Sequence, residues 1–256
     1  MKFSVLGSSS SGNCIYIESG GTRILVDAGF SHKRTKERLA QIGVDIGSID
    51  GLCLTHEHAD HTAGLPVMYC KHHIPLFATG GTSTAVEVNT KKNFGWNLFE
   101  PGMSFEIGTM HFETFSVSHD ASDPVGYVVS DGISRLGIAT DMGATPDMVA
   151  RHLRGCNALI LEFNHDKTLL ENCDRPWELK ARIAGNKGHL SNEQAYDLLR
   201  NIADDALRTV FLAHISAECN TPQMAIRYAE EALSCCGLCG NARICVPTWP
   251  FPLMDV

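Results

Sequence analysis

Three histidines and one aspartate lie together in the segment THEHADH at positions 55–61. In the H-x-H spacing, alternate residues of an extended segment or tight turn point to one side, so His56 and His58 can share a metal ion. Asp60 and His61 then turn toward a second ion close by. Imidazole and carboxylate are the ligands expected for zinc, manganese or iron, and the absence of a thiolate argues against a purely structural zinc. Because an apolar run typical of a strand precedes it, we interpret this segment as a dinuclear metal site rather than a chance surface cluster.

The elements that must position this segment alternate between strands and helices. Apolar and β-branched runs predict strands at 3–7, 14–19, 22–27, 52–56, 74–78, 103–108, 110–118, 125–131, 135–141, 158–163 and 209–214. Capping signals, among them Ser31 and a capping box of Ser191 with Gln194, predict helices at 31–43, 146–154, 166–185, 195–203 and 222–234. Since no linker or repeat interrupts the chain, residues 1–256 are expected to form one α/β domain, with two sheets inside and helices outside.

Four candidate ligands each follow the end of an expected strand. The segments LCLT, HFETFSVS, RLGIAT and TVFLA lead into His56, His119, Asp141 and His214, respectively. Strand ends on a rigid scaffold can converge on one edge of a pair of sheets, where side chains are held in place. The pattern therefore places the candidate site at such an edge.

The composition fits an ordinary globular enzyme. At 256 residues, 44% hydrophobic and 20% charged, the chain can bury a substantial core. The apolar stretch at the N-terminus is too short for a secretory signal. No apolar run approaches the roughly 18 residues of a membrane span. We therefore expect a cytoplasmic protein without a membrane partner. The net charge of −8 argues against general nucleic-acid binding by a basic surface, although local basic runs lie at 33–38 and 91–92.

Ten cysteines are scattered along the chain, which in a reducing compartment favours buried thiols over disulfides. Only Cys235, Cys236, Cys239 and Cys245 cluster. The CxxC pair of Cys236 and Cys239 could help to bind a structural zinc, but no second pair stands at finger-like spacing. Buried thiols are the favoured interpretation.

The HxHxDH pattern resembles the signature of the metallo-β-lactamase superfamily, and the resemblance extends over essentially the whole chain. It implies an αββα sandwich of two mixed sheets flanked by helices. Asp27 in LVDAG matches the family's early aspartate, which braces the metal loop. His119 in VSHD, Asp141 in ATDMG and His214 in LAHIS match the remaining ligands. By this analogy one ion is held by His56, His58, His119 and Asp141, and the other by Asp60, His61, Asp141 and His214.

This ligand set implies a hydrolase with two divalent ions, which lower the pKa of a bridging water and stabilise the charge that develops. Asp60 is the ligand expected to orient the nucleophile and take up its proton. Diiron flavoproteins of this fold carry Glu where this chain has His58, so a redox role is disfavoured. Little chain follows His214, which argues against the helical substrate domain of glyoxalase II proteins.

The segment GHLSN, followed by LAHIS, resembles ribonuclease Z, in which a histidine at the start of a helix precedes the final metal ligand. The resemblance makes His189 the candidate for phosphate contact or for proton donation to the leaving oxygen, with Glu162 in LEFNHD as its acidic partner. His165 and Asp166 are candidates to line the same cleft. In GSSSSGN, the hydroxyls and close N–H groups suit a phosphate or oxyanion, which suggests substrate contacts from Ser9, Ser10, Ser11 and Asn13.

Taken together, these motifs resemble the YycJ (WalJ) branch of the superfamily. That resemblance implies a cytoplasmic 5′-to-3′ exonuclease acting on DNA. The segment between Asp141 and His189 is too short for the β-CASP insertion of the larger relatives, and the basic arm of ribonuclease Z has no counterpart here. These departures keep a small-molecule phosphodiesterase, acting on a cyclic or nucleotide-like substrate, as an alternative. A non-phosphate metallohydrolase or a metal-binding regulatory protein is the third interpretation. The native metal and the oligomeric state are left open.

Overall fold

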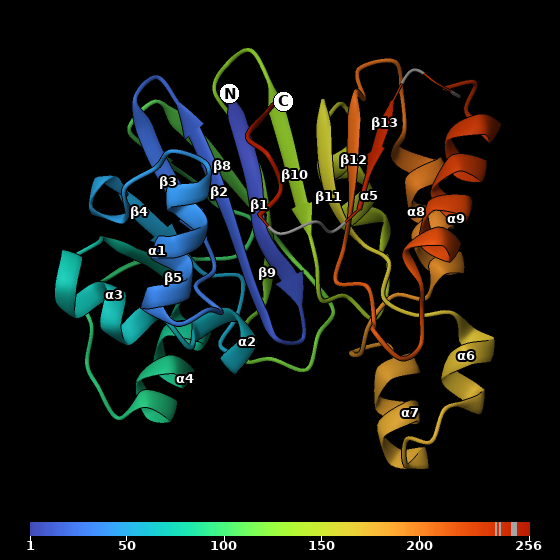
Figure 1. The fold of residues 1–256 in the computed structure, drawn as a ribbon, viewed down its shortest axis with the longest axis horizontal. Helices are drawn as coiled ribbons and strands as arrows, with labels where there is room; N and C mark the ends of the chain where they lie inside the picture. The colour runs from blue at the N-terminus through green and yellow to red at the C-terminus, as the bar shows by residue number, and fades with distance from the viewer. Residues whose placement is uncertain (239, 241, 247–249) are drawn as a thin grey trace.

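A computed structural model of the chain describes residues 1–238, 240, 242–246 and 250–256. Two β-sheets pack face to face, and helices cover the outer side of each (Figure 1). Both sheets are mixed, so the four layers form an αββα sandwich. The fold class expected from the sequence is confirmed.

The first sheet has the order β14-β1-β2-β3-β4-β5-β6. Pairing is antiparallel from β14 to β3 and parallel from β3 to β6. Its strands are β1 (Lys2–Ser9), β2 (Gly12–Ser19), β3 (Thr22–Val26), β4 (Gly51–Cys53), β5 (Leu76–Thr79), β6 (Trp96–Phe99) and β14 (Met254–Asp255).

The second sheet has the order β13-β12-β11-β10-β9-β8-β7. Pairing is antiparallel from β7 to β10 and parallel from β10 to β13. Its strands are β7 (Ser104–Ile107), β8 (Met110–Ser116), β9 (Val125–Ser130), β10 (Arg135–Ala139), β11 (Ala158–Glu162), β12 (Thr209–Ala213) and β13 (Arg243–Cys245).

The helices form the outer layers and one edge of the molecule. Their bounds are α1 (His32–Gln41), α2 (Ala59–Thr62), α3 (Leu65–His72), α4 (Gly80–Thr90), α5 (Asp147–Leu153), α6 (Lys167–Asn172), α7 (Trp177–Ala184), α8 (Asn192–Ile202) and α9 (Pro222–Cys235), with a 3₁₀ turn at Ile46–Ser48. Figure 1 shows α1, α3 and α4 beside the first sheet and α8 and α9 beside the second, with α2, α6 and α7 at the lower edge. None of the described helices is long and apolar enough to cross a membrane.

Apolar side chains fill the interfaces between these layers. Between the two sheets lie large aromatic and branched residues, among them Phe3, Phe112, Tyr127 and Ile160. Separate clusters join the first sheet to α1 and α3, and the second sheet to α5, α8 and α9. Strands β11 and β12 are buried along their whole length, since helices cover one face and the other sheet covers the opposite face. This double burial explains why ALILE and TVFLA are continuous apolar runs.

Several boundaries differ from those expected. The segment 166–185 forms two short helices, α6 and α7, because Pro176 cannot continue a helix and caps the second one instead. The GSSSSGN segment is mostly strand, since β1 continues to Ser9 and β2 begins at Gly12. The helix expected at 195–203 begins at Asn192, directly after Ser191, and the capping box is present.

Helices α3 and α4 and strands β6, β13 and β14 are not predicted by the sequence patterns. Helix α4 reads GGTSTAVEVNT, which is rich in residues with weak helix propensity. It is stabilised by the Thr79 hydroxyl, which accepts a hydrogen bond from the Thr82 amide, and by the packing of Val86 in the first sheet's outer core. Tertiary contacts therefore override local preference here.

Two of the C-terminal cysteines that the structure describes, Cys235 and Cys236, have local partners. The Cys236 thiol donates to the carbonyl of Arg200, and the Cys235 thiol lies 3.5 Å from the Tyr196 hydroxyl. Cys245 is buried in β13. Cys239, the other member of the CxxC pair, lies outside the described residues, so the zinc alternative stays a hypothesis.

Gly29 permits a close backbone approach between the loop after β3 and the THEHADH segment. Its amide donates to the carbonyl of Asn13 at 2.9 Å. A Cβ at this position would lie 1.8 Å from the carbonyl oxygen of Asp60 and 2.5 Å from the amide nitrogen of Asn13. Both neighbours are backbone atoms, so neither can rotate away.

We expect Gly29→Ala to lower the free energy of unfolding by about 1–3 kcal/mol or more, because the added methyl group must push the Asp60 backbone aside. Urea unfolding measures this effect. The matched control is Gly80→Ala, where an added Cβ meets open space at the start of α4. It should stay within about 0.5 kcal/mol of the parent. Equal stability of the two variants would contradict the close approach.

Candidate metal centre

The residues predicted as metal ligands lie together at one edge of the sheet pair. The THEHADH segment follows β4 of the first sheet, and His119, Asp141 and His214 follow β8, β10 and β12 of the second. Asp27, Asp141 and His214 have positive φ angles of 64°, 58° and 54°. Such left-handed backbone is uncommon outside glycine and is concentrated at functional sites. The turns at Asp141 and His214 aim these side chains at the ligand cluster, and the turn at Asp27 places its carboxylate behind His61.

His56, His58 and His119 form the first group of convergent nitrogens. The His58 Nδ1 atom lies 3.1 Å from the His56 Nε2 atom and 3.3 Å from the His119 Nε2 atom. One nitrogen from each ring lies within 4.8 Å of the others. Three imidazoles that converge in this way can hold a divalent ion and leave a further position open.

Asp60, His61, Asp141 and His214 form a second group beside the first. The His61 Nε2 atom lies 3.5 Å from Oδ2 of Asp60 and 3.4 Å from Oδ2 of Asp141. The His214 Nε2 atom lies 3.9 Å from Oδ2 of Asp60. Asp141 also groups with His56 on one side and with His214 on the other. Its carboxylate therefore lies between the two groups, as expected for a residue shared by two ions.

Two buried atoms in this centre have no hydrogen-bond partner among the described residues, namely Oδ2 of Asp141 and Nε2 of His214. Buried polar atoms are nearly always paired, because an unpaired one costs free energy. A cation between them would satisfy both atoms. The donor set therefore fits divalent metal ions.

The charge state of the ligands agrees with this fit. Burial lowers the pKa of His56 well below its ordinary value and also lowers that of His119, so both rings are neutral and able to ligate. Burial alone would raise the pKa of Asp141, but His214 and His61 hold it well below the usual range. Burial opposes a charged His61, yet Asp27 and Asp141 raise its pKa to about 10. A metal ion would take the place of the second proton on that ring.

Asp27 orients the metal loop without joining the convergent groups. Its Oδ1 accepts the Thr55 amide at 2.9 Å, and its Oδ2 accepts the Thr55 hydroxyl at 2.8 Å. The same Oδ2 lies 2.8 Å from Nδ1 of His61. A carboxylate behind a ligand histidine fixes its orientation and leaves Nε2 to face the metal. This geometry agrees with the bracing role expected for Asp27.

Three further residues brace the centre and were not predicted from the sequence. The Ser8 hydroxyl accepts the His214 amide at 2.9 Å, and the Asn164 side-chain amide donates to the His214 carbonyl at 2.8 Å. Glu57 accepts both the amide and the hydroxyl of Ser122 at 2.8 Å. Glu57 lies inside the HxHxDH pattern, so its position in that motif could have identified it as a supporting residue. Ser8 and Asn164 have no such signal, since their role depends on chain segments that are distant in sequence.

His189 and Glu162 form a pair beside the second group. The His189 Nδ1 atom lies 2.7 Å from Oε1 of Glu162, which is fully buried and also lies 3.1 Å from Nδ1 of His214. Burial would raise the pKa of Glu162, but His189 lowers it to about 2. Burial would lower the pKa of His189, but Glu162 and Asp141 raise it to about 9. The pair is therefore an ionised carboxylate and a protonated imidazole.

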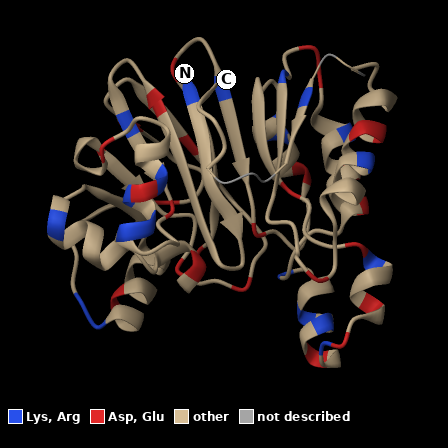
Figure 2. Ribbon diagram, in the orientation of Figure 1, with Lys and Arg blue, Asp and Glu red and all other residues tan. Residues whose placement is uncertain are grey.

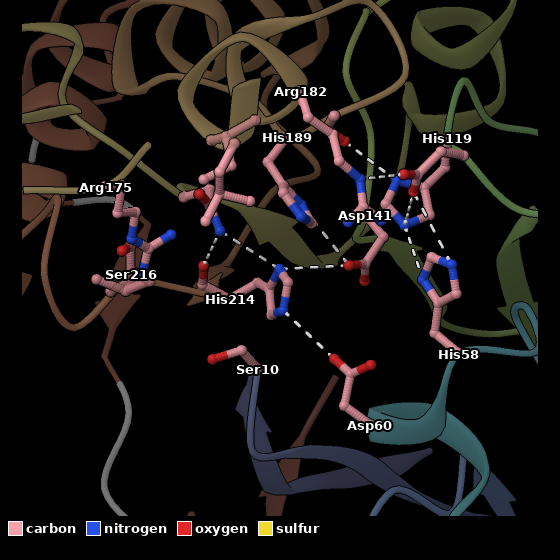
Figure 3. A pocket seen from close by; sticks show the side chains of 16 residues that line it. Ser10, His58, Asp60, His119, Asp141, Arg175, Arg182, His189, His214 and Ser216 are labelled. Carbon is pink, nitrogen blue, oxygen red and sulfur yellow. Dashed lines mark hydrogen bonds and ion pairs between the residues drawn. The ribbon is translucent and has the colours of Figure 1, made fainter. Parts of the chain in front are cut away.

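A pocket of about 260 Å³ opens onto these groups (Figure 3). Its lining includes Ser10, His58, Asp60, His119, Asp120, Asp141, Asn164, Arg175, Leu179, Arg182, Ile183, His189, His214 and Ser216. Of the substrate contacts expected in GSSSSGN, only Ser10 reaches this lining. The hydroxyl of Ser9 accepts the amide of exposed Ser11 in the hairpin turn.

Asn13 and His165 also lie away from the pocket surface, contrary to the expectation. The Asn13 side-chain amide is buried and lies 3.2 Å from Oδ2 of Asp60, so it braces a ligand. His165 is 1% exposed, and burial lowers its pKa to about 4. Asp166 caps α6, where its side chain accepts the Leu169 amide.

Comparison with known proteins agrees with this geometry. Residues 22–215 match the family model described as a beta-lactamase superfamily domain. Exodeoxyribonuclease YycJ of Bacillus anthracis is 34% identical over 91% of this chain and 89% of its own. Exodeoxyribonuclease WalJ of Streptococcus pneumoniae is 34% identical over 88% of this chain and 85% of its own.

A solved structure supports the same fold. The metallo-beta-lactamase fold protein YhfI from Bacillus subtilis matches with a TM-score of 0.76 at 15% identity, covering 100% of this chain and 99% of that one. At this identity the likeness concerns the fold alone, while the family model and the two exodeoxyribonucleases establish the relationship. The chain belongs to the metallo-β-lactamase superfamily, in the branch that contains YycJ and WalJ.

Proposed function

We propose that this protein is a metal-dependent phosphodiesterase, specifically an exonuclease that digests DNA in the 5′-to-3′ direction. The observation that carries the proposal is the His189–Glu162 pair beside the metal-ligand cluster, because cleavage of a phosphodiester expels an oxygen that needs a proton. Two relatives named exodeoxyribonuclease, each 34% identical over most of its length, support DNA as the substrate.

Two divalent ions held by these ligands would activate a water molecule and neutralise the scissile phosphate. The proposed sets are those implied by the family resemblance: His56, His58, His119 and Asp141 for one ion, and Asp60, His61, Asp141 and His214 for the other. Zinc, manganese and iron all suit them. Asp60 lines the pocket, and the Asn13 amide holds its Oδ2 in place, so this carboxylate is suited to orient the nucleophile and take up its proton.

His189 is proposed as the proton donor to the leaving oxygen. Its ring lines the pocket and is protonated near neutral pH, because Glu162 and Asp141 raise its pKa to about 9 against the effect of burial. Since Nδ1 is engaged by Glu162, Nε2 is the atom that carries the transferable proton. The proposal treats residues 1–256 as one domain, because both sheets supply ligands, and retains the cytoplasmic location expected from the sequence.

A small-molecule phosphodiesterase is the second candidate. The pocket volume of about 260 Å³ lies below the roughly 300–1,000 Å³ of sites for drug-sized ligands. Figure 2 shows positive and negative residues mixed along α6 and α7, without a continuous basic arm. The small pocket and the mixed charges of α6 and α7 also suit an exonuclease that admits only the end of a DNA chain.

The two candidates are separated by incubating the metal-loaded protein with end-labelled DNA and with a chromogenic phosphodiester. We expect stepwise loss of nucleotides from the 5′ end, abolished by a chelator, with elemental analysis giving about two ions per chain. Asp60→Ala should be inert on both substrates, since it removes a ligand and the group proposed to orient the nucleophile.

Asp205→Ala is the matched control, because Asp205 is exposed and lies outside the pocket lining. It should retain the parent activity. Cleavage of the chromogenic ester alone would contradict the proposal of a nuclease. Full activity in the presence of the chelator would contradict the proposal of metal dependence.

The role of His189 is tested by comparing leaving groups. His189→Ala should lower kcat on DNA by about 10²–10⁴-fold, the usual contribution of a general acid. The loss should be much smaller on the chromogenic ester, because its phenolate leaves without needing a proton. His111→Ala, at an exposed position on β8, is the control and should match the parent. An equal loss on both substrates would assign His189 to phosphate contact, and undiminished turnover would remove it from the mechanism.

A further inference from the structure

Two arginines line the pocket beside the metal-ligand cluster. In Figure 3, Arg182 lies near His119 and Arg175 lies near Ser216, with His189 in the region between them. Arg182 belongs to α7, and Arg175 belongs to the short segment that leads into it. One short stretch of the chain, 175–182, thus presents both side chains to the site.

Each arginine is paired with a carboxylate through its Nε atom. The Arg182 Nε atom lies 2.5 Å from Oδ2 of Asp120, and the Arg175 Nε atom lies 2.6 Å from Oε2 of Glu218. The side chains of Arg182 and Glu218 are 61% and 62% exposed, so one member of each pair faces solvent. Exposed ion pairs contribute little stability. The guanidinium groups can therefore exchange these partners for another anion, using N–H donors that the pairs leave available.

The charges that line the pocket indicate which anion Arg175 and Arg182 can bind. Asp60, Asp120 and Asp141 line it, and the ionised Glu162 lies directly behind. Metal ions would offset these carboxylates and the scissile phosphate, but the neighbouring phosphates of a DNA chain bring further negative charge. Of the residues that line the pocket, Arg175 and Arg182 are the two with a permanent positive charge.

We propose that Arg175 and Arg182 bind the phosphates on either side of the scissile one, an inference that rests on the proposed nuclease function. A guanidinium presents paired N–H donors that match phosphate oxygens. Leu179 and Ile183 line the same wall and offer apolar surface to a sugar or base. Binding by both arginines requires consecutive phosphates, so it favours an oligonucleotide over a small diester.

A purely structural role for these arginines makes different predictions. The Arg182–Asp120 pair joins α7 to the loop after β8, and the Arg175–Glu218 pair joins it to the loop after β12. If anchoring were their only role, their removal would lower stability and reduce turnover of all substrates in proportion. It would not alter the salt dependence, which counts contacts between cations and phosphates.

The test measures kcat and KM of Arg175→Ala, Arg182→Ala and the double variant on a single-stranded oligonucleotide over a series of KCl concentrations. The slope of log(kcat/KM) against log[KCl] should become shallower by about 0.7 for each arginine removed. At low salt, kcat/KM should fall roughly tenfold for each arginine, mainly through KM. The fall should be at least several-fold smaller on the chromogenic ester, which has one phosphate.

Two sets of controls separate charge from folding. Arg175→Lys and Arg182→Lys keep the charge, so they should retain the parent salt slope while losing part of the affinity that paired donors provide. Arg227→Ala removes the same charge from an exposed position on α9, outside the pocket, and should match the parent in slope and kcat/KM. Thermal unfolding of every variant shows whether the fold is retained.

Unchanged salt slopes in the alanine variants, with DNA cleaved by the parent, would overturn the inference and leave the proposed function standing. Equal losses on DNA and ester, together with lower thermal stability, would also overturn it in favour of anchoring. Failure of the parent itself to degrade DNA would instead overturn the proposed function.

Discussion

Carboxylates buried between the ends of the two sheets impose the constraint on which the rest of the structure depends. Asp27 and Asp141 are each 2% exposed and Glu162 is fully buried. A buried charge costs several kcal/mol unless it is paired and hydrogen bonded. The surrounding imidazoles, amides and hydroxyls supply that pairing, and they hold the pKa values of Asp141 and Glu162 low despite burial. The loops at this edge are arranged around those three groups.

This constraint links folding to metal binding. The convergent donors come from loops of both sheets, so the separate layers must be packed before the donors can meet. Oδ2 of Asp141 and Nε2 of His214 have no hydrogen-bond partner among the described residues, which leaves part of the cost of burial uncompensated by the protein alone. Binding of a cation would recover that free energy and stabilise the folded chain. The strained φ angles of Asp141 and His214 fit the same view, since the well-packed strand that precedes each residue holds it in place.

The sequence predicts which metal-ligating side chains converge better than it predicts which residues line the pocket, and the reason is physical. Metal ligation demands particular residue types at fixed spacing, so THEHADH is informative without a structure. Strand register determines which serine faces the pocket, and a bulge between Val5 and Gly7 shifts the register of the first hairpin. A shift of one residue reverses which side chains face the site. Ser8 therefore braces His214 and Ser10 reaches the pocket, whereas Ser9 bonds within its own turn.

The strands and helices also differ in how well local sequence patterns predict them. Fully buried β11 and β12 are evident as apolar runs, because both of their faces are covered. Short β13 and β14 pair with strands far away in the chain, and α4 is stabilised by packing, so local patterns do not reveal them. The ion pairs of Arg175 and Arg182 depend on contacts between the segment 175–182 and two distant loops, which no local motif encodes.

The spacing of parallel strands explains how Asp141, Glu162 and His214 come to act together. Strands β10, β11 and β12 are neighbours in the second sheet and run parallel, so their carboxyl ends lie side by side. Glu162 ends β11 in register with Ala213, directly before His214, and Asp141 stands just beyond the end of β10. Adjacent strands lie roughly 4.8 Å apart. Ligand atoms that share a cation at about 2.1 Å lie roughly 3–4 Å apart, so side chains that turn inward from adjacent strand ends can reach one cation without a long loop. Backbone hydrogen bonding of the sheet thereby sets the dimensions of the metal centre.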